Sequence, residues 1–479
     1  MTSDGLGRQA AARSTARERF WLRLGVMAVT LLGAGFRFGT LGRQSYDDEE
    51  AYTLRLLHGS FGHMLSGVAH QESTPPTYYG VAWMWSRAFG TGEFALRPPS
   101  AIAGTLLVPV SFLAAYAFLG RPRPALAVAT ITAVSPILIW YSQDARSYAF
   151  YALSSALTLL FFARLRENPS RSNAIGWATA SIATIWIHYL AGFLVLGEAL
   201  LLTRAPNRRR FVPAFTAVGL SAALAVPLAA HQYVAAEGLR SFTSASIAWR
   251  VWEVPLRFIF FYYNPGRTAA AIVAITAAAI LAYRGRHVGS STLALGLGGF
   301  AVALPCVLAA AAILDVFFFR NVLAAWLTLL IAVAAGFERV RFPSAAIAAV
   351  AVIILAISVQ SARKIDLQRD SWRPAVAALR VERPPLVVTN DGVTPPVYWP
   401  TLRALNQRGM DTREVDLAGR YVTSGSELGV EGFQPARFRR VGNIGIRTFA
   451  ADRPRHIVPE QFQYAGLVAF VTPTSTSSP

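Results

Sequence analysis

The chain has 479 residues, of which 54% are hydrophobic and 15% charged. This composition is typical of a polytopic membrane protein and excludes a soluble enzyme with a large water-facing surface. The formal net charge of +19 would also suit a nucleic-acid-binding protein, but the arginines occur in short clusters between apolar runs, as they do in cytoplasmic loops. We therefore expect no nucleic-acid partner.

Residues 1–20 are polar and rich in arginine, and the apolar stretch 21–40 follows them. No small-residue cleavage site follows this stretch, so we predict an uncleaved anchor rather than a signal peptide. The arginines before it keep the N-terminal tail in the cytoplasm.

Segment 75–90 decides the topology of the following loop. It is shorter than the ~20 residues that a span needs, and it is rich in Tyr and Trp, which favour membrane interfaces. If it crossed the membrane, Arg121 and Arg123 would lie outside. Every later arginine-rich loop would then lie on the face that the positive-inside rule disfavours. We therefore predict that 75–90 and 51–68 are interfacial helices within an outer loop, 42–98.

We expect about eleven membrane-spanning helices in all. After the first, they cover residues 99–119, 124–141, 149–164, 174–189, 190–203, 211–230, 268–284, 291–314, 321–337 and 343–360. Every loop predicted inside carries arginines, and the remaining outer loops are 142–147, 231–267 and 315–320. The prediction is thus a multi-pass protein of the cell membrane with a transmembrane module at 21–360.

From residue 361 the hydropathy falls, and residues 361–479 are numerous enough to form a small domain. Strands are predicted at 385–389, 440–449 and 467–471, and a helix at 372–381. We expect an extracytoplasmic α/β domain.

Several motifs on the predicted outer face resemble those of the protein O-mannosyltransferase and aminoarabinose transferase superfamily, the GT-C, family 39 type of glycosyltransferase. They are Tyr-Asp-Asp-Glu-Glu-Ala-Tyr-Thr at 46–53, Glu-Ser-Thr-Pro-Pro-Thr-Tyr-Tyr at 72–79, Phe-Gly at 89–90 with Glu93 to Arg97, the segment 135–148 and Phe-Arg at 319–320. The resemblance implies an inverting transfer of a sugar from a polyprenyl-phosphate donor to a hydroxyl acceptor at the outer leaflet.

Such a transfer needs a carboxylate that takes the acceptor proton and cations that neutralise the departing phosphate. In the family the proposed base is the Asp of an Asp-Glu pair that precedes a small residue. Aligning on Glu50 places Glu49 there, whereas keeping an aspartate places Asp48 there. We expect Asp48 and Glu49 to act jointly, with Asp47 and Glu50 as further candidates. The alternative is that these acids cap the following helix.

Six further residues are candidates for binding the sugar, acceptor or phosphate: Arg37, Glu72, Asp144, Arg146, His188 and Arg320. Asp144 and Arg146 lie together in one outer loop, and the alternative for them is an exposed ion pair. Arg37 lies inside the first span, where a charge needs a partner. For Arg320 the alternative is an interfacial residue that extends its charge to water.

In some relatives a carboxylate at the position of Glu72 helps to bind a metal together with a distant histidine. Glu72, His70, His188 and His231 are therefore weak candidates for a divalent metal site. A different class of function, a transporter or flippase of a lipid-linked or small solute, also fits a basic protein with many spans. Transporters tend to have repeated halves and charged residues near the midplane, whereas this chain concentrates its acids in an outer loop.

Overall fold

The computed structural model describes residues 3–205, 208–235, 246–261, 268–288, 318–364, 368–463 and 466–473. The predicted span 291–314 lies outside the described residues, as do parts of the predicted loops 231–267 and 315–320. The chain forms two compact units. The helical unit comprises Met1–Leu41 and Leu56–Ser361, and the C-terminal unit comprises Gly42–Arg55 and Ala362–Pro479. The acidic motif thus belongs to the C-terminal unit.

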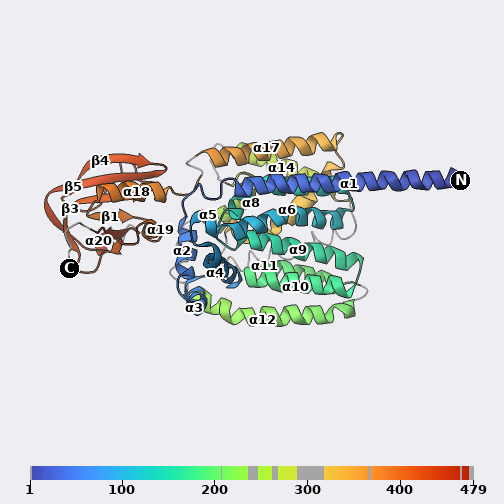
Figure 1. Cartoon of the computed structure of the whole chain (residues 1–479), viewed down its shortest axis with the longest axis horizontal. Helices are drawn as coiled ribbons and strands as arrows, with labels where there is room; N and C mark the ends of the chain where they lie inside the picture. Colours follow the sequence, from blue (N-terminus) through green and yellow to red (C-terminus); the bar gives the residue numbers. More distant parts are fainter. Residues whose placement is uncertain are drawn as a thin grey trace. The chain divides into compact units, whose positions relative to one another are not determined.

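The helical unit is a bundle in which helices from distant parts of the chain run side by side (Figure 1). Its helices are α1 (Ser3–Phe38), α3 (Phe61–Gln71), α4 (Thr77–Phe89), α5 (Glu93–Leu96), α6 (Pro98–Leu119), α7 (Pro122–Val134), α8 (Pro136–Ser142), α9 (Tyr148–Glu167), α10 (Arg171–Ile187), α11 (Ala191–Leu202), α12 (Val212–Ala235), α13 (Ile247–Phe260), α14 (Thr268–Gly285), α16 (Leu323–Phe337) and α17 (Pro343–Arg363). Short 3₁₀ turns, η1 (Arg208–Phe211) and η4 (Phe319–Val322), precede α12 and α16.

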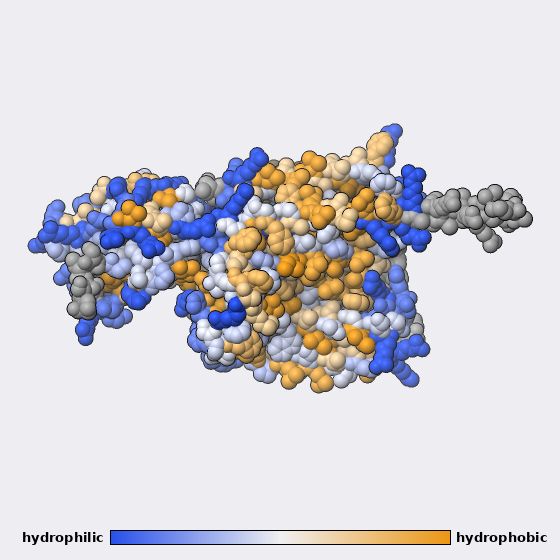
Figure 2. Space-filling view, in the orientation of Figure 1, coloured by the Kyte–Doolittle hydropathy of each residue, from blue (hydrophilic) through white to orange (hydrophobic). Residues whose placement is uncertain are grey.

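Seven helical segments among the described residues are long and apolar enough to cross a membrane, or eight if the bent pair α7 and α8 counts as one span. Helix α6 shows the pattern: Ala101, Val108 and Ala115 are buried against neighbouring helices, whereas Ile102 and Leu106 are exposed. Figure 2 shows that apolar side chains cover much of the visible face of this unit. An exposed apolar surface of this extent is suited to lipid rather than water. The chain is built as a multi-pass membrane protein.

Helices occupy each predicted span that the structure describes, but the span predicted at 124–141 is broken. Helices α7 and α8 meet at an angle of 56°. The break falls at Ser135, whose backbone is extended (φ −63°, ψ 123°), and at Pro136. Proline lacks an N–H and disfavours a helical conformation in the residue before it, which explains the break.

The predicted outer loop contains more helices than expected. The prediction of one helix over 51–68 is wrong, because α2 (Asp48–Leu57) ends before α3 begins. Gly59 has a positive φ of 82°, and the Ser60 hydroxyl accepts a hydrogen bond from the His63 N–H at 3.1 Å, which caps α3. Helix α4 has 13 residues, so its length of about 20 Å is shorter than the ~30 Å of a bilayer core.

The loops predicted on one membrane side meet in the structure. Arg121 Nη1 lies 3.2 Å from Glu338 Oε2, which joins the loop after α6 to the residues after α16. At the other ends of α6 and α9, the Ser100 hydroxyl donates to the Arg146 carbonyl at 3.2 Å. These contacts at opposite ends of α6 agree with the predicted alternation of loops between the two membrane sides. Which end faces the cytoplasm stays a prediction.

The C-terminal unit contains a six-stranded sheet with helices α18 (Trp372–Glu382), α19 (Thr394–Tyr398) and α20 (Glu460–Gln463). The strand order is β2 (Arg403–Ala404), β6 (Val468–Val471), β1 (Leu386–Thr389), β3 (Met410–Gly419), β5 (Ile444–Ile457) and β4 (Gln434–Val441). Strands β1 and β3 are parallel, and the other pairs are antiparallel. Two apolar clusters form its core, one around Trp372 and Ile446 and the other around Val388 and Phe449.

The predicted strands at 385–389 and 467–471 and the helix at 372–381 are confirmed as β1, β6 and α18. The strand predicted at 440–449 is confirmed for 444–449, which belong to β5, but not as a single strand: 440–441 end β4, and 442–443 form the turn of the β4–β5 hairpin. Gly442 has φ 62° and takes the first of the two turn positions, where a positive φ suits the twist of the strands. Strand β3 was not predicted, because a bulge between Thr412 and Glu414 interrupts its alternation.

Helices α14 and α16 approach each other through two glycines. A Cβ atom at Gly285 would lie 2.5 Å from the Gly336 nitrogen, and one at Gly336 would overlap the Leu281 carbonyl oxygen. The two backbones are therefore in direct contact, an arrangement that small residues allow in membrane helices.

We expect Gly336→Ala to lower the free energy of unfolding by about 1–3 kcal/mol, because the backbones must separate to admit the methyl group. Gly219→Ala is the matched control: Gly219 lies in α12, and nothing lies within 4 Å of its added Cβ. Thermal unfolding of the two variants in detergent measures the difference. Equal melting temperatures would contradict the close contact.

Candidate functional site

The first turn of α2 is closed by two of the four consecutive acids. The Glu50 N–H donates to Asp47 Oδ1 at 2.9 Å, and the Asp47 N–H donates to Glu50 Oε2 at 3.3 Å. Two reciprocal bonds of this kind form a capping box, which satisfies N–H groups that the helix start leaves without partners. The capping interpretation of these acids is therefore correct for Asp47 and Glu50.

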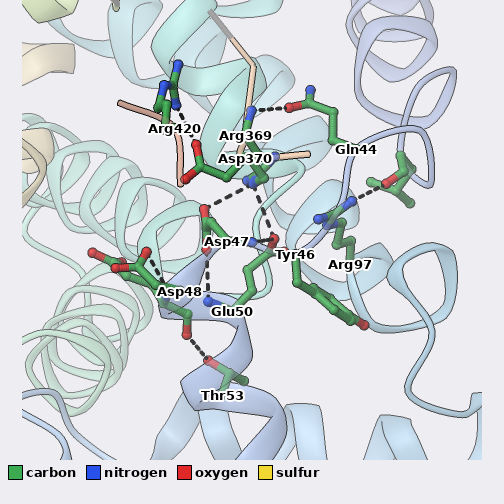
Figure 3. A network of polar contacts seen from close by, with 12 residues as sticks. Gln44, Tyr46, Asp47, Asp48, Glu50, Thr53, Arg97, Arg369, Asp370 and Arg420 are labelled. Carbon is green, nitrogen blue, oxygen red and sulfur yellow. Dashed lines mark hydrogen bonds and ion pairs between the residues drawn. The ribbon is translucent and has the colours of Figure 1, made fainter. Parts of the chain in front are cut away.

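Asp48 and Glu49 are not part of this box. Asp48 Oδ1 accepts a bond from the Glu49 N–H at 3.0 Å, and its residue surface is exposed. Figure 3 shows its side chain extending away from Arg369, whereas Asp47 and Glu50 lie beside that arginine. The four acids thus form two pairs. Asp47 and Glu50 cap the start of α2, whereas the side chains of Asp48 and Glu49 take no part in the capping box.

A residue that the sequence did not indicate completes the motif. Arg369 Nε lies 3.1 Å from Asp47 Oδ2 and 3.2 Å from Glu50 Oε2. Both Arg369 and Glu50 are buried. A buried cation between two carboxylates offsets the cost of removing their charges from water. Arg369 lies 322 residues after Asp47 in the sequence, and no local pattern connects the two segments.

The pKa values of two acids are raised. Burial and the charge of Glu50 raise the pKa of Asp47 to about 6, although Arg369 opposes them. Partial removal of water and the charges of Asp47, Glu49 and Asp391 raise the pKa of Asp48 to about 7. Because Asp48 keeps an exposed surface, repulsion from its charged neighbours is the cause that its geometry supports most directly. A carboxylate whose pKa lies near neutral pH is suited to accept a proton.

Two of the predicted binding residues form a buried ion pair in the helical unit. Arg146 Nη1 and Nη2 donate to the two carboxylate oxygens of Glu72 at 2.6 and 3.2 Å. Asp144 is buried in the same short loop between α8 and α9. The Gln143 amide anchors this loop by donating to the Phe36 and Arg37 carbonyls at 2.9 and 3.0 Å. These bonds fix the loop at the end of α1.

His188 and Arg320 lie close to this ion pair. The His188 ring lies within electrostatic range of the Arg320 and Arg146 guanidiniums. The same ring stacks on Tyr151, with ring centroids 4.3 Å apart. The Tyr151 hydroxyl donates to the Asn321 carbonyl at 3.0 Å. His188 Nδ1 is buried, and no described residue accepts or donates a hydrogen bond there. Glu72 and Arg146 are thus in direct contact, and His188 lies within electrostatic range of Arg146 and Arg320; their role in binding stays a prediction.

Arg37 is fully buried and has a structural set of partners. Its guanidinium donates to the Gly33, Ala133 and Thr132 carbonyls at 3.0–3.1 Å and to the Ser142 hydroxyl at 3.0 Å. The Thr132 carbonyl would be bonded by the N–H four residues later in an unbroken helix, but that residue is proline. Arg37 therefore supplies the donor that Pro136 lacks, and this role explains its position without a phosphate.

The metal candidates do not form a ligand set in the helical unit. Glu72 is held by Arg146, and the His70 and His231 rings meet edge to face with centroids 4.9 Å apart. In the C-terminal unit, Asp47 and Glu50 have oxygens within 4.8 Å of each other, but Arg369 lies against both. A cation bound by this pair would compete with Arg369, so the donor set of either unit is a poor fit for a divalent ion.

We expect Arg37→Gln to lower the free energy of unfolding by at least about 3 kcal/mol, because several buried carbonyls would lose a donor worth about 1–3 kcal/mol each. Arg123→Gln removes an exposed arginine from the same unit and serves as the control. Thermal unfolding in detergent gives both values. An unchanged melting temperature for Arg37→Gln, with weaker binding of undecaprenyl phosphate, would instead favour the phosphate role.

Comparisons with known proteins found similarities in structure alone: no family model and no curated protein matches the chain. The chain is similar to ArnT from Cupriavidus metallidurans in the apo state, with a TM-score of 0.48 and 16% identity over 76% of this chain and 66% of ArnT. With ArnT bound to undecaprenyl phosphate, the TM-score is 0.46 and the identity 16%, over 75% and 66% of the chains.

An oligosaccharyltransferase from Archaeoglobus fulgidus, tethered to an acceptor peptide, gives a TM-score of 0.41 and 12% identity over 75% of this chain and 57% of its own. The chain therefore spans less than two thirds of the length of each of these proteins. At these identities the likeness concerns the fold. These identities and TM-scores record a distant likeness and do not assign the chain to a family.

Proposed function

We propose that the protein transfers a sugar from a polyprenyl-phosphate-linked donor to a hydroxyl acceptor at the outer face of the membrane, with inversion at the sugar carbon. Asp48 and Glu49 share the role of the base. Two observations support this assignment: the capping box uses Asp47 and Glu50 and not Asp48 or Glu49, and the pKa of Asp48 lies near neutral.

In the proposed reaction the acceptor oxygen attacks the anomeric carbon of the sugar. The acceptor proton passes to the carboxylate of Asp48 or Glu49 as the new C–O bond forms. The bond between the sugar and the phosphate breaks, and its electron pair stays on the phosphate oxygen. Cations near that oxygen stabilise the charge that develops there.

We assign the leaving phosphate to the cationic residues of the helical unit. Arg146 and Arg320 both lie within electrostatic range of His188. The Arg146 guanidinium carbon lies 5.8 Å from the centre of the Tyr79 ring, and that of Arg320 lies 5.7 Å from the centre of the Tyr148 ring. Two arginines with a histidine whose Nδ1 has no partner among the described residues suit an anionic ligand. Glu72 fixes the Arg146 guanidinium through two hydrogen bonds.

This location also suits a lipid-linked donor. The cationic residues follow the ends of membrane helices α8 and α10 or precede α16, so a polyprenyl tail can stay in lipid while its phosphate reaches them. The acidic motif begins shortly after α1, with Asp48 ten residues beyond Phe38. On this proposal the N-terminus is cytoplasmic and the C-terminal unit extracytoplasmic.

Among the residues that the structure describes, nothing gives comparable support to the alternative function, a transporter. Its best candidate is Glu198, an acid within the apolar helix α11, since an acid inside the membrane marks a transport path in many proteins. Glu198 is buried, and its two oxygens accept bonds from Trp177 Nε1 at 2.8 Å and from the Thr158 hydroxyl at 3.1 Å. These bonds join α11 to α9 and α10, which is a structural role.

We expect Asp48→Asn combined with Glu49→Gln to abolish sugar transfer while the protein still inserts into the membrane. Each single variant should lose part of the rate, because a general base contributes about 10²–10⁴-fold. Mass spectrometry of envelope glycans and glycoproteins, in a deletion strain complemented with each variant, measures transfer. Wild-type transfer by the double variant would exclude this pair as the base.

We expect the transfer rate to fall as the medium pH drops below about 7. The base acts only when deprotonated, and the pKa of Asp48 is raised to about 7, so below that pH the rate should fall about tenfold per pH unit. Sugar incorporation by washed cells in media of different pH tests this, with the residual rate of Asp48→Asn as the control. A profile that is flat between pH 5 and 8 would contradict the assignment.

A further inference from the structure

Residues 44–46, immediately before Asp47, are bound by residues 369–373 and by Tyr398, all within the C-terminal unit. The Arg369 N–H donates to Gln44 Oε1 at 2.9 Å, and the Arg373 N–H donates to the Ser45 hydroxyl at 3.1 Å. The Tyr46 N–H donates to the Tyr398 hydroxyl at 2.7 Å. The loop is thus fixed residue by residue up to the start of the capping box.

Arg369 also binds the capping box itself, through its side chain. This side chain is 1% exposed, and its Nε lies between the carboxylates of Asp47 and Glu50. Without the cation, two negative charges would meet at a site where Glu50 has no access to water, and one of them would have to protonate or turn away. Either change would break a bond that closes the first turn of α2.

Arg369 is held in turn by the β4–β5 hairpin. Asn443, in the turn of that hairpin, donates from Nδ2 to the Arg369 carbonyl at 3.1 Å and accepts from the Ser371 N–H at 2.8 Å. Asn443 is buried. The position of Arg369 therefore depends on the fold of the sheet and not on a flexible tail.

The sheet also acts on Asp48 directly. Asp391 follows the end of β1, and its Oδ1 accepts bonds from the Val393 and Thr394 N–H groups at 3.0 and 2.8 Å, which fixes its carboxylate. Its charge is one of three, with Asp47 and Glu49, that disfavour the ionised form of Asp48. The C-terminal unit thus influences both the place and the charge of this acid.

We propose that Arg369 is a positioning residue for the base: through Asp47 and Glu50 it holds the first turn of α2 so that Asp48 and Glu49 are presented to the acceptor. The inference rests on the proposed function and extends it. It makes the C-terminal unit a part of the catalytic apparatus, so that this unit is required for transfer itself and not only for the choice of acceptor.

The test compares Arg369→Gln, Arg369→Lys and the control Arg413→Gln in the complemented deletion strain. Arg413 is an exposed arginine of β3. We expect Arg369→Gln to lower the incorporation of sugar into the envelope about 10–100-fold, as a misplaced catalytic group does. Lysine restores the charge but not the fork, so it should recover part of this loss. Arg413→Gln should keep the wild-type rate.

Two measurements separate positioning from other roles. Binding of undecaprenyl phosphate to the full-length chain in nanodiscs should change less than about twofold in Arg369→Gln, because a positioning residue lowers the rate without weakening donor binding. In the background Asp47→Asn with Glu50→Gln, the added Arg369→Gln should cost less than about twofold, since an arginine that acts through these carboxylates has no further effect once they are neutral.

A second variant keeps the test decisive if Arg369→Gln fails to accumulate. In that case the rate of Arg369→Lys, which keeps the charge but not the fork, should still lie below that of the wild type while the binding of undecaprenyl phosphate stays within about twofold. A wild-type rate for Arg369→Gln, a wild-type rate for Arg369→Lys where the glutamine variant does not accumulate, or a fully additive loss in the combined variant would each overturn the inference. If the double variant of Asp48 and Glu49 also kept the wild-type rate, the proposed base would fail as well, which distinguishes the two failures.

Discussion

The candidate site depends on the balance of charge around the start of α2. Four acids in sequence are a costly element for any fold, because neighbouring carboxylates repel one another and lose water when they are enclosed. The chain resolves this by using Asp47 and Glu50 as a reciprocal cap and by placing Arg369 against both. The cap supplies hydrogen-bond acceptors to the N–H groups at the helix start. The Arg369 guanidinium balances the charge of the two capping carboxylates.

Much of the helical unit could be predicted from the sequence, because apolar runs of the right length have few alternatives to helices in a membrane. Charge alternation correctly grouped Arg121 with the loop after α16, as its ion pair with Glu338 shows. The break at Pro136 was missed because hydropathy alone does not register a missing N–H. The strand predicted at 440–449 ran across the turn of the β4–β5 hairpin, because that turn has only two residues.

The site was predictable in part. The motifs of the outer face named Glu72 and Arg146 as separate candidates, and the structure shows them as a buried ion pair; their role in binding stays a prediction. Arg369 was out of reach, since its pairing with residues more than 300 positions earlier leaves no trace in local periodicity or spacing. The division of the four acids into two pairs was also undetermined, because it depends on where α2 begins, and helix boundaries are the least predictable part of a pattern.

The junction of α7 and α8 joins two residues that would each be unfavourable alone. A proline within a span leaves a carbonyl without its donor, and an arginine within a span needs acceptors away from lipid. Because Arg37 donates to the Thr132 carbonyl that Pro136 leaves open, each residue removes the penalty of the other. An alanine at position 136 would restore the backbone donor and set it in competition with the guanidinium, so these two positions can change safely only as a pair.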